Sequence, residues 1–175
     1  MPDILVWLRG LFEWVGALES SIELRGSIYL APYITVSHII CMSLFAGTIV
    51  MMDLRLLGVG NMQTSFSQLQ RRLFPWQLAG MALSTVTGLA LVFANPMNYF
   101  ANVIFWTKMG TMVMAGVNAL AFHYITYHSV TDWDEGVTPP FGARLAGLLG
   151  IVLWANVIVI GRMIPYWNLW FGQRV

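Results

Sequence analysis

The chain has 175 residues and a net charge of +1; 58% of its residues are hydrophobic and only 10% are charged. Soluble globular domains carry about 25% charged residues, so this composition excludes an ordinary soluble protein. The small net charge and the lack of a Lys/Arg run exclude a nucleic-acid partner. A single cysteine, Cys41, excludes an intramolecular disulfide and any CxxC motif for metal or haem attachment.

Residues 3–19 predict an amphipathic helix that lies in the plane of the membrane interface. Apolar side chains recur on one face of this helix, and Arg9 and Glu13 lie on the other. Trp7 and Trp14 would then lie at the level of the lipid headgroups. A secretory signal is the competing interpretation, but its start would be acidic and two charges would interrupt its apolar core.

Four apolar runs follow, and each is long enough to cross a bilayer as a helix, which takes about 20 residues. We expect spans at 28–57, 74–94, 102–127 and 144–164. Pro75 would lie in the first turn of the second span, where a missing N–H costs nothing. The predicted fold is an all-α membrane protein, a single domain over residues 1–175. Its four transmembrane helices form an antiparallel bundle after the interfacial helix.

The expected location is the bacterial inner membrane, with both termini outside. Arginines are equally numerous on the two sides of the predicted bundle, so the count alone does not orient the chain. Arg71 and Arg72 are the only clustered arginines and lie in the first loop, which we therefore assign to the cytoplasm. The first and third loops thus mark the inner end of the bundle.

Small residues recur with near-helical spacing in three of the spans. They are Ser43 and Gly47; Gly80, Ser84 and Gly88; and Gly147 and Gly150. In lipid the hydrophobic effect does not drive helices together, so close backbone contact at small residues does much of this work. We therefore expect these positions to form the packing seams of the bundle.

Depth counting at ~1.5 Å per residue predicts a polar layer in the outer half of the bundle. Its members are His38, Thr87, Lys108 and Asn156. Ionisable groups inside a span mark candidate functional sites, so this layer is a candidate cofactor-binding site. Lys108 has a second interpretation, in which its ammonium extends outward to the membrane surface. Asn118 shares a helical stripe with Lys108 and is expected to bind a ligand or form an interhelical hydrogen bond.

A haem b buried between helices would most simply take two histidines at one level. His123 lies roughly 16 Å deeper than His38, so the two cannot ligate one haem. A haem would need His38 together with Lys108, a methionine or a histidine of another subunit. A quinone pocket lined by His38 and Lys108 is the related alternative.

Copper is the other candidate cofactor, because His38, Cys41 and Met42 follow the spacing i, i+3, i+4 on one helix. Soft sulfur together with imidazole suits Cu(I). No second histidine joins this group at the same level. A copper site here would therefore need further ligands.

At the inner end of the bundle, Asp53, Arg55, His123 and Arg144 are expected at similar depth. We interpret them as an interfacial charge network rather than as a catalytic group. The chain lacks Gly-x-Ser-x-Gly and HExxH motifs and carries no paired carboxylates within a span. We therefore expect no catalytic activity.

Three strings of the chain are SHIICMSLFAGTIVMMDLRLLG, VTGLALVFANPMNYFANVIFWTKMG and AGVNALAFH, within residues 37–123. They resemble uncharacterised small bacterial four-helix membrane proteins that are distantly similar to the CopD-type copper-resistance membrane domain. The resemblance implies a bacterial inner membrane and a link to copper or redox proteins. The positions of this chain to which the resemblance applies are His38, Asp53, Arg55, Thr87, Gly88, Lys108 and Asn118.

From these features we expect an accessory subunit of a larger membrane complex, linked to redox or copper chemistry. It would contact lipids and other membrane subunits, in a hetero- or homo-oligomer, through the first helix and the aromatic tail at 165–170. A b-type cytochrome or quinone-binding electron-transfer subunit is the first alternative, and a copper-handling membrane protein is the second. Haem b, quinone and copper thus stay open as cofactors.

Overall fold

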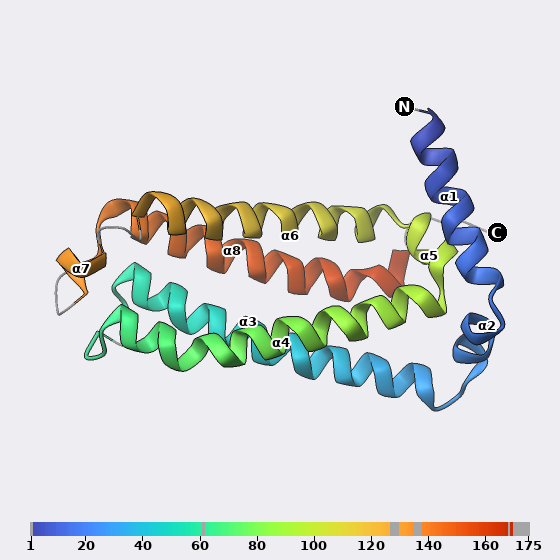
Figure 1. Ribbon diagram of the computed structural model, residues 1–175, viewed down its shortest axis with the longest axis horizontal. Helices are drawn as coiled ribbons and strands as arrows, with labels where there is room; N and C mark the ends of the chain where they lie inside the picture. Colours follow the sequence, from blue (N-terminus) through green and yellow to red (C-terminus); the bar gives the residue numbers. More distant parts are fainter. Residues whose placement is uncertain (1, 61, 127–129, 135–137, 168, 170–175) are drawn as a thin grey trace.

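A computed structural model of the protein describes residues 2–60, 62–126, 130–134, 138–167 and 169. Four long helices lie lengthwise beside one another, with their connections at alternating ends (Figure 1). They are α3 (Leu30–Leu57), α4 (Phe66–Ala94), α6 (Val103–Ala121) and α8 (Phe141–Met163). The described ranges contain no strand. Each of the four is long and apolar enough to cross a membrane, if α6 is counted with the turn that follows it. The number of candidate spans is therefore the predicted one.

Three short helices gather at one end of the long ones, which we call the α1 end (Figure 1). They are α1 (Pro2–Ala17), α2 (Glu19–Gly26) and α5 (Pro96–Phe100). The opposite end carries α7 (Val130–Trp133) and is called the α7 end. The helix expected over 3–19 ends two residues early, at Ala17, because the backbone is extended at Leu18, where ψ is 135°, and a second helix begins at Glu19.

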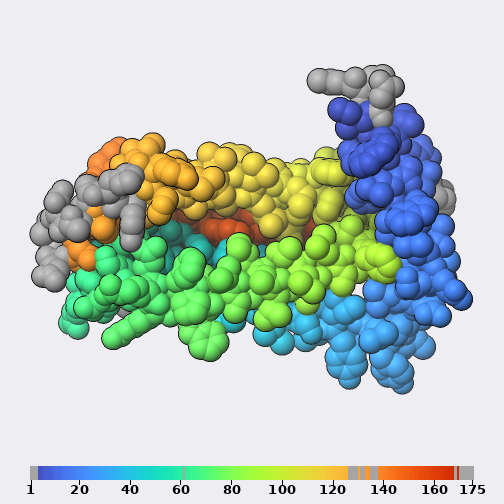
Figure 2. Space-filling model, in the orientation of Figure 1, coloured from blue at the N-terminus to red at the C-terminus, as the bar shows by residue number. Residues whose placement is uncertain are grey.

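The long helices form a row in the order α4, α3, α8, α6. Helix α3 packs along α4 on one side and along α8 on the other, and α6 packs along α8. Among the described residues, α4 and α6 share no comparable contact. Figure 2 shows a hollow between α4 and α6 with atoms of α8 visible inside it. This face of the molecule is therefore grooved along its length.

Small residues of α4 bring its backbone close to α3. Gly80 and Ser84 are buried, and a Cβ on Gly80 would lie 3.1 Å from the backbone nitrogen of Phe45. Two helical turns further, a Cβ on Gly88 would lie 3.1 Å from Cε1 of His38. The stripe predicted on the second span is thus the α3–α4 seam.

Helix α8 approaches α3 in the same way through Gly147 and Gly150, as expected. A Cβ on Gly147 would lie 2.7 Å from the carbonyl oxygen of Asp53. The pair Ser43 and Gly47 does not form a seam, which corrects the prediction: both residues are exposed, and a Cβ on Gly47 would meet nothing within 4 Å. A spacing of four residues places two side chains on the same side of α3, but it does not show whether that side faces a neighbouring helix.

Helix α4 begins two turns earlier than its apolar run, at Phe66. The reason is the cap at Ser65, whose hydroxyl accepts a hydrogen bond of 3.2 Å from the backbone N–H of Gln68. Pro75 consequently lies inside the helix rather than in its first turn. Beyond Ala121, α6 continues as one π-helical turn, Phe122–Thr126.

The α1 end is joined to the bundle by α5 and the residues after it. The buried side chain of Asn102 caps α6 by accepting from the N–H of Phe105, and its amide donates to the carbonyl of Ile164 at 3.0 Å. Burial raises the pKa of Tyr99, so this phenol stays neutral where it packs on the Phe105 ring. Trp170 of the predicted aromatic tail lies outside the described residues.

The α3–α4 seam can be tested by enlarging its tightest glycine. We expect Gly80→Leu to lower the free energy of unfolding by about 1–3 kcal/mol, because the added atoms collide with α3 backbone. The matched control is Gly47→Leu, which adds the same side chain into open space and should change stability by less than about 0.5 kcal/mol. Unfolding in detergent by added SDS measures both. Equal effects of the two substitutions would contradict the seam.

Candidate functional site

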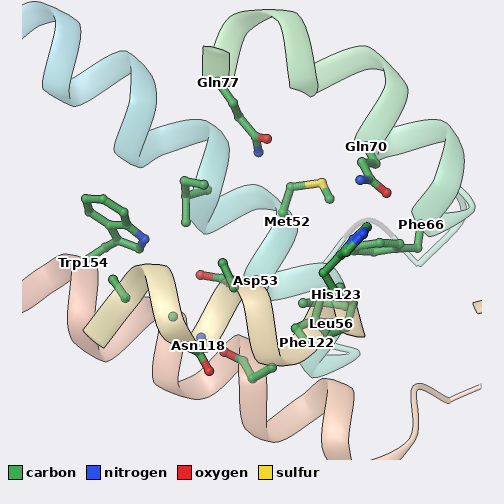
Figure 3. A pocket seen from close by; sticks show the side chains of 15 residues that line it. Met52, Asp53, Leu56, Phe66, Gln70, Gln77, Asn118, Phe122, His123 and Trp154 are labelled. Atoms are coloured by element: carbon green, nitrogen blue, oxygen red, sulfur yellow. Dashed lines mark hydrogen bonds between the residues drawn. The ribbon is translucent and has the colours of Figure 1, made fainter. Parts of the chain in front are cut away.

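A cavity of about 200 Å³ lies among the four long helices, nearer the α7 end (Figure 3). Its polar lining residues come from three segments, α3, α4 and the end of α6. They are Asp53, Gln70, Gln77, Asn118 and His123. The rest of the lining is mostly apolar or aromatic and includes Phe66, Phe122 and Trp154. The cavity therefore combines an apolar body with a few polar groups, as small-molecule sites do.

Asp53 is the acidic residue of this cavity. Its side chain is only 8% exposed, and its Oδ2 atom is buried without a hydrogen-bond partner among the described residues. The carboxylate fits there because Gly150 lacks a side chain: a Cβ at that position would lie 2.7 Å from Cγ of Asp53. An uncompensated acid inside a membrane span is costly, which makes Asp53 a functional candidate.

Two of the three amide side chains around the cavity form hydrogen bonds within the protein. Asn118 donates to the carbonyl of Ala146 on α8 at 2.9 Å, the interhelical hydrogen bond that its position suggested. Gln77 donates to the carbonyl of Thr48 on α3 at 3.5 Å. The Oε1 atom of Gln70 is buried and has no hydrogen-bond partner in the described part of the chain. Two residues that line the cavity, Asp53 and Gln70, thus each have a buried oxygen atom without a hydrogen-bond partner among the described residues.

Nearer the α1 end, the structure brings His38 and Thr87 together, as depth counting predicts. His38 Nδ1 lies 3.0 Å from Thr87 Oγ1, and that hydroxyl lies 2.7 Å from the carbonyl oxygen of Leu83. A hydroxyl has one proton, and a carbonyl can only accept it, so we assign His38 Nδ1 as the donor. His38 Nε2 then carries the lone pair of the ring.

Lys108 belongs to the same region and turns inward. Its side chain is half-buried, and a Cβ on Gly161 of α8 would lie 3.3 Å from its Nζ. The amino group of Lys108 therefore lies against α8 instead of extending outward. No described residue forms an ion pair with Nζ that would neutralise it.

Asn156 is not part of this layer, which corrects the prediction. Its side chain is exposed and donates to the carbonyl of Val152 on its own helix at 3.0 Å. Cys41 and Met42 are half-buried on α3, in the turn after His38. No group of three or more His, Cys, Asp and Glu side chains suited to a metal occurs within the described ranges.

Arg55 is completely buried at the α7 end and does not form the predicted charge network. Its Nε donates to the carbonyl of Thr64 at 3.0 Å and its Nη2 to the carbonyl of Asp134 at 3.2 Å. The carboxylate of Asp134 in turn accepts from the backbone N–H of Ser67. Arg55 therefore joins two loops by backbone contacts.

The remaining members of the predicted network also lie apart. Arg144 is exposed and forms no ion pair with Asp53, and the exposed His123 side chain lines the cavity. Asp53 and Arg55 are two residues apart on one helix, so they face different sides. Residues at the same depth in the membrane can point in different directions around their helices, so depth alone does not show that they are in contact.

The sequence does not predict the cavity itself. The depth of Asp53 along the first span assigns this residue to the interfacial network. Nothing in the sequence around Gln77 or Trp154 indicates that they line a cavity. The available signal is the pairing of an acid inside one span with Gly147 and Gly150 in another. Close helix contact at those glycines is what encloses the carboxylate.

The chain belongs to a protein family of unknown function, DUF6644, whose model matches residues 11–167. The matched part includes the cavity and the His38 layer. No curated protein and no solved structure matches the chain. The comparisons therefore establish the family, are consistent with a family of small helical proteins, and give no likeness to the CopD-type domain.

The role of Arg55 can be tested with Arg55→Met, which keeps the length of the side chain but removes its donors. We expect stability to fall by about 1.5–3 kcal/mol, because two backbone carbonyls lose charge-assisted hydrogen bonds. Arg144→Met, at an exposed position, is the control and should have little effect. SDS-induced unfolding measures both. A variant as stable as the wild type would mean that burying the guanidinium costs as much as its bonds contribute.

Proposed function

We propose that this member of the DUF6644 family is an accessory subunit of a larger membrane complex. Four antiparallel helices would anchor it in a bacterial inner membrane, with α1 as an amphipathic helix in the interface and both termini outside. The observation that supports this role is the position of α1. Helix α1 runs across one end of the four long helices, and its first turns extend past their side (Figure 1).

Helix α1 is fixed to the bundle at its carboxyl-terminal half. A Cβ on Gly16 would lie 3.2 Å from Cγ of Pro96, and the rings of Phe12 and Phe100 have centroids 5.3 Å apart. Helix α2 adds a second attachment, because the buried Ser21 hydroxyl donates to a carbonyl of α4 at 2.7 Å. The exposed part of α1 is therefore held in a defined direction.

Helix α1 carries large apolar side chains that are exposed in the described structure, both in its projecting first turns and at Trp14, nearer the bundle. Ile4, Trp7 and Trp14 are 65%, 66% and 62% exposed. Exposed tryptophans suit both the membrane interface and the centre of a protein interface. A neighbouring subunit covering this face would anchor the protein in a complex. The proposed redox or copper link of that complex rests on the sequence resemblance alone.

The accessory role predicts a stoichiometric partner in native membranes. We expect the tagged chain, extracted in mild detergent, to migrate on native gels as an assembly larger than its 19.6 kDa monomer. Replacing both Trp7 and Trp14 by Ala should release the monomer, because buried interface tryptophans each contribute about 2 kcal/mol or more. Trp76→Ala, at an exposed position on α4, is the control. A wild-type chain that runs as a lone monomer would refute this role.

An electron-transfer subunit is the second candidate, supported by the geometry around His38. The lone pair that we assign to Nε2 is available to a haem iron or to the hydroxyl of a quinol, the reduced form of a quinone, and Lys108 lies in the same region. A haem would need its second axial ligand from elsewhere. Copper held by His38, Cys41 and Met42 is the third candidate, and it rests on their i, i+3, i+4 spacing and on the soft sulfur donors.

Spectroscopy of the purified protein separates these candidates. A b-type cytochrome should show a Soret band that His38→Ala abolishes and that His123→Ala leaves intact. A copper protein should show stoichiometric copper by elemental analysis, lost in the same His38 variant. A protein with no band, no metal and no extractable quinone would exclude electron transfer and copper handling by this chain.

A further inference from the structure

When the carboxyl of Asp53 is ionised, its buried Oδ2 atom requires a positively charged or hydrogen-bonding partner. No described residue supplies a hydrogen bond to this atom. Arg55 donates to two backbone carbonyls instead, and Arg144 is exposed. Burying an ionised carboxylate without a partner is strongly unfavourable. A ligand that carries a cationic N–H group would remove this cost.

The walls of the cavity suit the body of an organic cation. Phe66, Phe122 and Trp154 line it together with aliphatic side chains. Aromatic rings attract cations through their π faces, with Trp the strongest of them. The volume of about 200 Å³ is far larger than a bare ion requires. A cavity of about 150 Å³ already holds a benzene ring, so the space matches a small ring with an amine.

The bundle has an open side between α4 and α6. Helices α4 and α6 are the two ends of the row and do not pack along each other in the described structure. Figure 2 shows the resulting hollow between them, with α8 inside it. Both helices that border the hollow are membrane-spanning by length and composition. Residues of both helices also line the cavity, so this hollow is the side from which a molecule dissolved in the bilayer would approach it.

We propose that the cavity beside Asp53 binds a lipid-soluble amine in its protonated form. The ammonium group pairs with the Asp53 carboxylate, and the amide of Gln70 is available as a second hydrogen-bonding group. The apolar body of the ligand lies against Trp154 and the phenylalanine rings, and any tail extends between α4 and α6. This site is separate from the α1 face and from His38, so it stands whether or not the chain is an accessory subunit.

The probes for this site are para-butylbenzylamine and its neutral analogue para-butylbenzyl alcohol. Each is titrated calorimetrically into the full chain in lipid nanodiscs at neutral pH, and the heat of empty nanodiscs is subtracted. We expect saturable binding of the amine, with the alcohol at least about tenfold weaker, since an ionic hydrogen bond is lost. Equal binding of both probes, or no saturable binding of the amine, would overturn the proposal.

Asp53→Asn then identifies the group responsible, because it keeps the shape of the side chain and removes its charge. We expect it to abolish the preference for the amine, while Glu23→Gln, which removes an exposed carboxylate on α2, keeps it. A preference that survives in a folded Asp53→Asn variant would overturn the proposal. If that variant fails to fold, the comparison of the two probes on the wild type still decides whether the site binds a cation.

Discussion

Close approach of one helix to two neighbours is the constraint on which this structure depends. Gly80 of α4 and Gly147 of α8 each come within a few ångströms of the α3 backbone, from different sides. Between them, Phe45 of α3 packs edge-on against Trp154 of α8, with ring centroids 4.8 Å apart. Because lipid tails are as apolar as the side chains, such close packing must hold the helices together. It also fixes α4 and α6 at the two ends of a row, and this separation leaves room for the cavity.

Three ionisable groups inside the bundle share one structural setting, a glycine on the neighbouring helix. His38 faces Gly88, Lys108 faces Gly161 and Asp53 faces Gly150. A glycine in a membrane helix usually serves close backbone packing. Here each glycine also provides the space that a polar side chain occupies. The polar groups near His38 and near Asp53 are therefore accommodated in the same way, by a glycine on the neighbouring helix.

The sequence predicts the four membrane spans because an apolar run of about 20 residues is typical of a helix that crosses a bilayer. It also predicts the contact of His38 with Thr87, since depth along two helices can be counted. Rotation of a helix about its own axis is harder to predict when every face is apolar. For this reason the sequence places Ser43 and Gly47 in a seam and Asn156 in the polar layer, although all three are exposed. The cavity depends on the rotation of four helices at once.

The π-helical turn at Phe122–Thr126 has a consequence for how members of this family compare. Such a turn holds one residue more than an α-helical turn that bridges the same gap, because its hydrogen bonds close over five residues. A relative that lacks a single residue in this stretch would replace it with ordinary α-helix and keep the position of the preceding span. Alignments of the family should therefore allow a one-residue gap here, and the side chain that aligns with His123 need not be its spatial equivalent.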